Sequence, residues 1–171
     1  MSETGLSISE RAISKGAWLT LLIIISDQAT KYFAEQMLAL HQPVAIIPML
    51  NFTLAYNTGA AFSFLHQAGG WQNNFFIVIA LVMSIVLLVM LYRTPRKELQ
   101  FSLALWLVLG GAIGNVIDRI RINKVVDFID FYIAEWHFAT FNIADIAISI
   151  GAFLLIMDSI NIRFIRPRSS Q

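Results

Sequence analysis

Two aspartates in the second half of the chain, Asp127 and Asp145, are the residues best suited to chemistry. Asp127 is flanked by two valines and a phenylalanine, an apolar setting for a carboxylate. Asp145 follows Asn142 by three residues, so both side chains project from one face if this segment is helical. Two carboxylates brought together disfavour simultaneous ionisation, and one of them then holds a proton near neutral pH. Such a pair supplies a general base to activate water and a general acid to protonate a leaving amine.

Other catalytic groups are scarce in this sequence. It has no cysteine, which excludes disulfides, thiolate metal sites and cysteine nucleophiles. Its three histidines stand singly with no metal-ligand spacing, so we expect neither a metal nor a cofactor. A serine–lysine arrangement of Ser26 and Lys31 is a minor alternative. The net charge of +1 argues against binding to nucleic acid.

The elements that must position these residues are mostly membrane-spanning helices. Of the 171 residues, 57% are hydrophobic and 13% are charged, about half the charge of a typical soluble domain. Four apolar segments approach the roughly 20 residues that cross hydrocarbon. They comprise residues 16–38, 74–92, 99–120 and 141–162. We therefore predict a mainly α membrane protein with a single membrane-embedded domain, residues 1–171, whose first apolar segment is a retained helix.

The two longer connections differ from the helices in composition. Residues 39–73 hold aromatic and β-branched residues and an Asn-Thr-Gly turn signal at 57–59. This pattern predicts two short strands joined at that turn, in a small β-sheet on the membrane surface between the first two helices. A second aromatic-rich segment, residues 128–141, separates the last two spans, and its Tyr132, Trp136 and His137 suit a membrane interface.

The basic residues predict the orientation of the chain. Eight of the 12 Lys and Arg residues lie before the first span, between the second and third, or after the fourth. The connection of residues 39–73 has none. The positive-inside rule then places both termini in the cytoplasm and both aromatic-rich connections outside. Arg119, Arg121 and Lys124 fall on the outer side and need another explanation.

In this orientation the polar residues of the spans converge on the outer membrane face. They are Asp27, Lys31, Asn115, Asp118, Arg119, Asn142 and Asp145. Ionisable groups inside a bilayer are costly and often functional. Simpler interpretations stay open: Asp27 and Lys31 as an ion pair that only holds helices together, and Arg119 as a side chain that snorkels to the headgroups. Asp130 and Glu135 are expected to be ordinary surface charges.

Two other classes of function stay open. Intramembrane charges also mark transporters and proton-coupled channels, although the charge-free second span offers no path to the cytoplasm. A non-catalytic membrane scaffold is the other alternative, but it has no need for two carboxylates in apolar settings.

Five sequence blocks in order resemble the lipoprotein signal peptidase family, also called signal peptidase II. They are DQATK (27–31), NTGAAFS (57–63), GGAIGNVIDR (110–119), VVDF (125–128) and FNIAD (141–145). The resemblance implies a bacterial inner-membrane aspartyl endopeptidase that cuts signal peptides from diacylglyceryl-modified prolipoproteins before the lipidated cysteine. It also implies contact with membrane lipids, inhibition by globomycin-type compounds, and an active site at the periplasmic face.

The resemblance also assigns roles residue by residue. Asp127 and Asp145 become the catalytic pair. Substrate-positioning or dyad-orienting roles go to Asn57, Asn115, Arg119 and Asn142. Structural support goes to Asp27 and Lys31. The family's β-cradle corresponds to the region from about Asn51 to Phe64.

Overall fold

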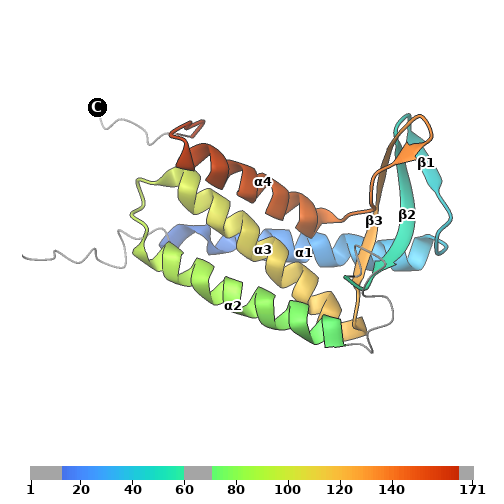
Figure 1. The fold of residues 1–171 in the computed structure, drawn as a ribbon, viewed down its shortest axis with the longest axis horizontal. Helices are drawn as coiled ribbons and strands as arrows, with labels where there is room; N and C mark the ends of the chain where they lie inside the picture. The colour runs from blue at the N-terminus through green and yellow to red at the C-terminus, as the bar shows by residue number, and fades with distance from the viewer. Residues whose placement is uncertain (1–12, 60–70, 166–171) are drawn as a thin grey trace, which may run out of the picture.

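The computed structural model describes residues 13–59 and 71–165. Within these ranges four helices lie side by side along the long axis, and a small sheet stands across one end of them (Figure 1). In chain order the elements are α1 (Ile13–Met37), β1 (Val44–Ile47), β2 (Leu50–Asn57), α2 (Trp71–Arg93), α3 (Leu99–Ile122), β3 (Val125–Ile133), β4 (Trp136–His137) and α4 (Ile143–Ser159).

Helix α3 is the centre of the bundle, because it packs against α1, α2 and α4. Leu91 of α2 and Leu105 of α3 are fully buried at the core of this packing. Helices α3 and α4 approach each other closely: a Cβ on Gly111 would lie 2.3 Å from the carbonyl oxygen of Ala144. Packing of helices through small residues is therefore the role of this glycine.

The outer surface of the bundle is apolar. Large hydrophobic side chains are exposed on α1, α2 and α4, for example Leu22, Ile85 and Ile156. By length and composition, α2 and α3 are the helices in the described part of the chain that could cross a membrane. Spans at α1 and α4 stay a prediction.

Helices occur at all four predicted segments, but their ends differ from the prediction. Helix α3 continues to Ile122 and stops because Asn123 takes a left-handed backbone conformation (φ 59°) and donates its N–H to the carbonyl oxygen of Arg119. Helix α4 begins at Ile143, since Asn142 has an extended backbone and acts as the N-cap.

Of the two strands predicted to meet at residues 57–59, the first is β2, and the strand predicted to follow the turn falls at residues 60–70, outside the described part of the chain. Strands β1 and β2 are joined at Pro48 and Met49, and Asn57 is the last residue of β2. Proline followed by a residue with positive φ (73° at Met49) is typical of a type II turn, but methionine at that position gives no sequence signal. The Asn-Thr-Gly segment forms a different turn, in which Gly59 donates its N–H to Asn57 Oδ1 at 2.8 Å.

The sheet also draws on both outer connections, whereas the prediction placed it only between the first two helices. Its antiparallel strand order is β1-β2-β3-β4, and β2 pairs with β3 along most of its length. Strand β3 lies in the segment expected to be only an interfacial connection. The remainder of the predicted cradle, residues 60–64, lies outside the described residues.

The three basic residues that disagree with the charge rule all have partners at the sheet end of the bundle. Arg121 Nη2 pairs with Glu35 Oε2 at 2.7 Å. The Lys124 ammonium lies 3.5 Å from the centre of the Tyr56 ring. The Arg119 guanidinium lies over an aromatic ring of α2. These ion-pair and cation–π contacts explain basic residues on this side of the protein.

Candidate active site

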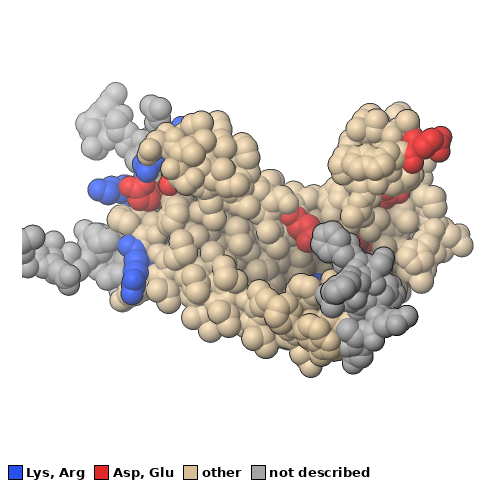
Figure 2. Space-filling view, in the orientation of Figure 1, with Lys and Arg blue, Asp and Glu red and all other residues tan. Residues whose placement is uncertain are grey.

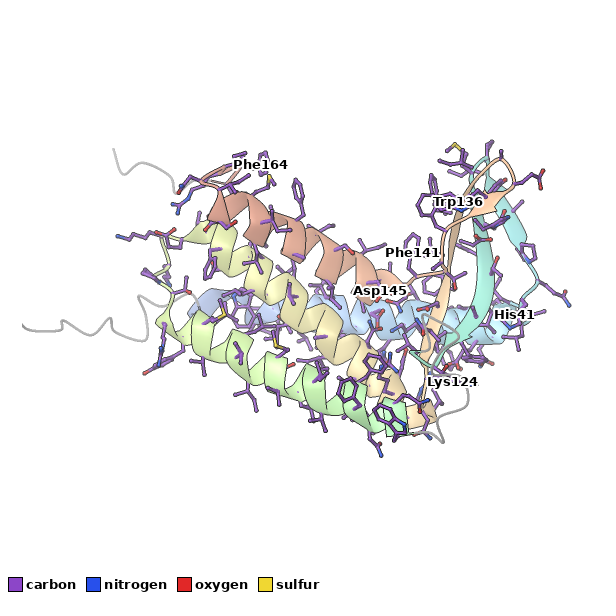
Figure 3. All side chains as sticks on the ribbon, viewed as in Figure 1. His41, Lys124, Trp136, Phe141, Asp145 and Phe164 are labelled. Carbon is purple, nitrogen blue, oxygen red and sulfur yellow. The ribbon has the colours of Figure 1, made fainter. Side chains whose placement is uncertain are left out.

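Short connections bring Asp127 and Asp145 to the same end of the bundle. Two residues separate the end of α3 from the start of β3, and Asp127 is the third residue of β3. Phe141, just before α4, exchanges backbone hydrogen bonds with Ile129 of β3 at 2.9 and 3.0 Å. The first turn of α4 is thereby tied to β3, and Asp145 lies at the start of α4 beside the sheet (Figure 3).

Asn142 contacts both aspartates. Its Nδ2 donates to Asp127 Oδ1 at 2.7 Å, and its Oδ1 accepts the backbone N–H of Asp145 at 2.9 Å. In return, Asp145 Oδ2 accepts the backbone N–H of Asn142 at 3.2 Å, which completes a capping box. Asn142 is fully buried. One side chain therefore caps α4 and fixes the position of the pair.

Asn115 of α3 supplies the second amide of the site. Its Nδ2 donates to Asp145 Oδ1 at 2.8 Å. Its Oδ1 accepts from Lys31 Nζ at 2.9 Å and from Asn142 Nδ2 at 3.2 Å. The two asparagines thus form a continuous hydrogen-bonded link between Asp145 and Asp127.

A buried cluster of charged side chains contacts the Asn115 amide through Lys31. Lys31 Nζ lies 2.8 Å from Asp27 Oδ2 and 2.9 Å from Asp118 Oδ2, and all three side chains are almost completely buried. Asp27 Oδ1 accepts the N–H of Ala144, and Asp118 Oδ2 accepts the N–H of Val126. The cluster therefore joins α1 to α3, α4 and β3, because each carboxylate needs partners in this dry setting.

Asp118 and Gln28 are members of this cluster to which the sequence interpretation gave no role. Gln28 Nε2 donates to Asp118 Oδ1 at 3.0 Å and to Asp27 Oδ2 at 3.2 Å. The available signal was the spacing of Asp118, three residues after Asn115 and so on the same side of a helix.

The environment of Asp127 favours its protonated form. Its side chain is almost wholly buried. Burial, together with the negative charge of Asp145, raises the pKa of Asp127 from 3.8 to about 7, although hydrogen bonds from Asn142 and Asn57 oppose the shift. Two neighbouring carboxyl groups with unequal surroundings can share one proton at neutral pH.

Arg119 faces the aspartates. Its guanidinium lies 4.7 Å from the centre of the Phe76 ring and is attracted electrostatically by Asp127, Asp145 and Asp118. Its buried Nη1 has no hydrogen-bond partner among the described residues. This placement favours a role at the site over snorkelling to the headgroups.

Two other expectations are changed by the structure. Lys31 has three acceptors and none of them is Ser26, so the serine–lysine arrangement has no support. Asp130 is not an ordinary surface charge: it is buried and its carboxylate contacts Asn51, Thr53 and His137. A polar residue on β3 needs such partners because the first part of this strand is buried.

The surface is hollowed between the bundle and the upright part of the sheet (Figure 2). Acidic atoms are visible beside this hollow, where Asp145 begins α4 (Figures 2 and 3). A substrate that reaches the aspartates has room on this side of the molecule.

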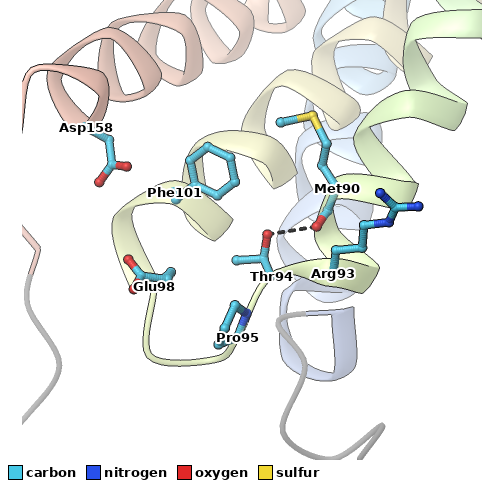
Figure 4. A pocket seen from close by; sticks show the side chains of 7 residues that line it. All are labelled: Met90, Arg93, Thr94, Pro95, Glu98, Phe101 and Asp158. Atoms are coloured by element: carbon cyan, nitrogen blue, oxygen red, sulfur yellow. Dashed lines mark hydrogen bonds between the residues drawn. The ribbon is translucent and has the colours of Figure 1, made fainter. Parts of the chain in front are cut away.

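A second cavity, of about 410 Å³, lies at the opposite end of the bundle, by the α2–α3 connection (Figure 4). Its two acidic residues, Glu98 and Asp158, are bridged by Arg163 at 3.1 and 3.3 Å. The acidic residues of this cavity are thus joined by an arginine, whereas Asp127 and Asp145 at the sheet end are joined by asparagines.

The fold is that of a bacterial membrane enzyme. A solved structure described as a bacterial membrane enzyme, determined by the in meso method at 1.9 Å resolution, superposes with a TM-score of 0.79 and 32% sequence identity. The match covers 90% of this chain and 97% of that one. A second structure with the same description, at 2.3 Å resolution, gives 0.79 and 30% over 95% of this chain and 97% of that one.

Sequence comparison defines the family. Residues 19–161 match the family described as Signal peptidase (SPase) II, and the chain belongs to this family of membrane peptidases. The lipoprotein signal peptidase of Coxiella burnetii (strain Dugway 5J108-111) is 58% identical over 140 residues, 82% of this chain and 86% of that protein. The lipoprotein signal peptidase of Hydrogenovibrio crunogenus is 52% identical over 161 residues, 94% and 91% of the two chains.

Proposed function

We propose that this protein is an aspartyl endopeptidase that removes the signal peptide from diacylglyceryl-modified bacterial prolipoproteins, cutting before the lipidated cysteine. Its relatives named lipoprotein signal peptidase support the substrate class. One observation supports the catalytic type: the buried side chain of Asn142 bonds to both Asp127 and Asp145. Nucleic acid, metals and cofactors have no part in the proposal.

The two aspartates take different roles in the proposed reaction. Asp127 carries the shared proton, because burial and the charge of Asp145 raise its pKa to about 7. Asp145 is the base, since both of its oxygens accept hydrogen bonds from N–H groups, one from Asn115 and one from Asn142.

The chemical steps follow from these roles. Asp145 takes a proton from water as the water oxygen attacks the scissile carbonyl carbon, while Asp127 gives its proton to the carbonyl oxygen. The resulting gem-diol collapses: Asp145 passes its proton to the departing amine nitrogen as the C–N bond breaks, and Asp127 regains a proton from one hydroxyl. The products are a carboxylic acid and an amine, and both aspartates return to their starting forms.

Three further residues are proposed to position the substrate or to orient the pair. Arg119, whose charge faces the aspartates, stabilises negative charge that develops on the substrate carbonyl. Asn57 lies at the end of β2, exposed and in contact with Asp127, where it can bond to the substrate backbone. Asn115 orients Asp145. Replacing Arg119 with alanine should lower activity partially, and an unchanged rate would favour snorkelling.

The proposed setting is the bacterial inner membrane, with four spanning helices, both termini in the cytoplasm and the site at the periplasmic face. Figure 2 supports this orientation, since Lys and Arg atoms gather at the end of the bundle away from the sheet. The substrate's signal helix and lipid chains would then stay in the membrane while the cleavage site enters the hollow. Globomycin-type compounds would occupy the same place, and the whole chain, residues 1–171, would act as one domain.

The test is cleavage of a lipid-modified preprolipoprotein, followed by gel shift with and without globomycin. Asp127→Asn and Asp145→Asn should insert and fold but leave the substrate uncut. Asp130→Asn is the matched control on the same strand, because Asp130 contacts neither aspartate of the pair, and it should retain cleavage. Full turnover by either dyad variant would contradict the assignment.

A further inference from the structure

Lys31 makes a third contact in addition to its two ion pairs. Its ammonium lies between the carboxylates of Asp27 and Asp118, and it also donates to Asn115 Oδ1 at 2.9 Å. A buried ammonium has three N–H groups, and Asn115 accepts from the one that the two carboxylates leave over. The lysine therefore connects the buried cluster to the residue that holds Asp145.

The contact with Lys31 decides which way the Asn115 amide points. A lysine ammonium can only donate hydrogen bonds, so it requires the oxygen of the amide on its side. The Nδ2 group is then directed to the other side, where it donates to Asp145 Oδ1 at 2.8 Å. A reversed amide would place N–H groups against the ammonium and a carbonyl oxygen against a carboxylate, and both contacts would be repulsive.

The second asparagine is oriented by the same principle but from a different source. The backbone N–H of Asp145 is also only a donor, and it holds Asn142 Oδ1 at 2.9 Å. Asn142 Nδ2 therefore points to Asp127 Oδ1. Each carboxyl group thus accepts a hydrogen bond from an amide N–H. The amide is oriented this way because a group that can only donate binds its oxygen on the other side. For Asn142 the donor belongs to the helix backbone, whereas for Asn115 it is the side chain of Lys31.

Resting on the proposed function, we propose that Lys31 is a positioning residue for catalysis: through Asn115 it aims a hydrogen-bond donor at Asp145, the carboxyl group proposed as the base. Without the ammonium, Asn115 Oδ1 keeps only the 3.2 Å contact from Asn142 Nδ2, so the amide is held less firmly with its N–H toward Asp145. The proposed base would then be positioned less well. The turnover rate falls while substrate binding, which Lys31 does not touch, is kept.

The experiment measures kcat and KM for cleavage of a lipid-modified preprolipoprotein. Lys31→Met alone leaves two unpaired buried carboxylates, so the principal variant is Lys31→Met/Asp118→Asn, which keeps the net charge of the cluster at −1. Its kcat should fall at least tenfold relative to Asp118→Asn alone, with KM unchanged within about threefold. The control Gln28→Leu loosens the same cluster without touching Asn115, and it should keep kcat within about threefold.

A third comparison asks whether Lys31 acts through Asn115. In an Asn115→Ala background, adding Lys31→Met/Asp118→Asn should lower kcat no further than Asp118→Asn does in that background. If Lys31→Met/Asp118→Asn still lowers kcat in the Asn115→Ala background as much as it does in the natural protein, the proposal is overturned, because the lysine would then act directly through its charge. Equal losses for the Gln28 and Lys31 variants would also overturn it, since both would reflect loosened packing.

The same assay separates this proposal from the proposed function. If Asp145→Asn keeps its turnover, the assignment of the pair fails, and the role of Lys31 fails with it. If Asp145→Asn is inactive while the charge-balanced Lys31 variant matches its Asp118→Asn parent, only the positioning role is wrong.

Discussion

Replacing Asp127 with asparagine removes a buried carboxyl group whose pKa is raised from 3.8 to about 7 by burial and by the charge of Asp145. Between these two pH values the folded protein holds a proton that the unfolded chain has released. The stabilisation linked to this proton is complete below pH 3.8 and is lost as the pH rises through 7. Each pH unit corresponds to about 1.4 kcal/mol, so the loss over the interval is about 4 kcal/mol.

Asparagine has nearly the same shape but does not titrate. The stability of Asp127→Asn relative to the natural protein should therefore rise with pH, by about 4 kcal/mol from pH 4 to pH 8. Equilibrium unfolding of both proteins in detergent micelles at several pH values measures this difference, and effects of titrating groups that are not coupled to Asp127 largely cancel. A difference that stays constant with pH, or that falls as the pH rises, would refute the reasoning.

Asp130 provides a control of opposite sign on the same strand. Burial acts to raise its pKa, but hydrogen bonds from His137, Asn51 and Thr53 outweigh burial and lower the pKa below 3.8. Its stabilisation is therefore present above pH 3.8 and is lost as the pH falls through the lowered pKa. Asp130→Asn should cost stability at neutral pH and cost less in strong acid.

Three further substitutions test the packing and capping around the site. Gly114→Ala would place a Cβ 2.6 Å from Asp27 Oδ2, so thermal unfolding should show a loss of about 1–3 kcal/mol. Asn142→Ala removes the N-cap bond of α4 and a donor to Asp127, and it should cost about 1–2 kcal/mol and abolish cleavage. Arg121→Ala breaks a partly exposed ion pair, so unfolding should change by less than about 1 kcal/mol and cleavage should persist.

The sequence was informative wherever the signal is local. The hydropathy pattern predicted both ends of each of the four helices to within a few residues. The signal is strong because a membrane-spanning helix requires a long run of apolar residues. The sheet was only half predicted. Its second half, β3, was missed because its pairing with β2 joins residues 68 to 81 positions apart, and the turn at Met49 has no sequence signature.

Asp127 and Asp130 illustrate what only the tertiary structure decides. They stand three residues apart on β3, both among apolar neighbours, and the sequence favoured Asp127 by its valine and phenylalanine flanks and by resemblance to a family. The tertiary structure places Asp127 against Asn142 and near Asp145, whereas Asp130 faces His137. A pKa depends on charge, donors and burial in space, so the same residue type on one strand is raised to about 7 at one position and lowered at the other. The sequence determined which side chains are available and which helices carry them, and the packing of α1, α3, α4 and β3 decided which carboxyl groups form the candidate pair.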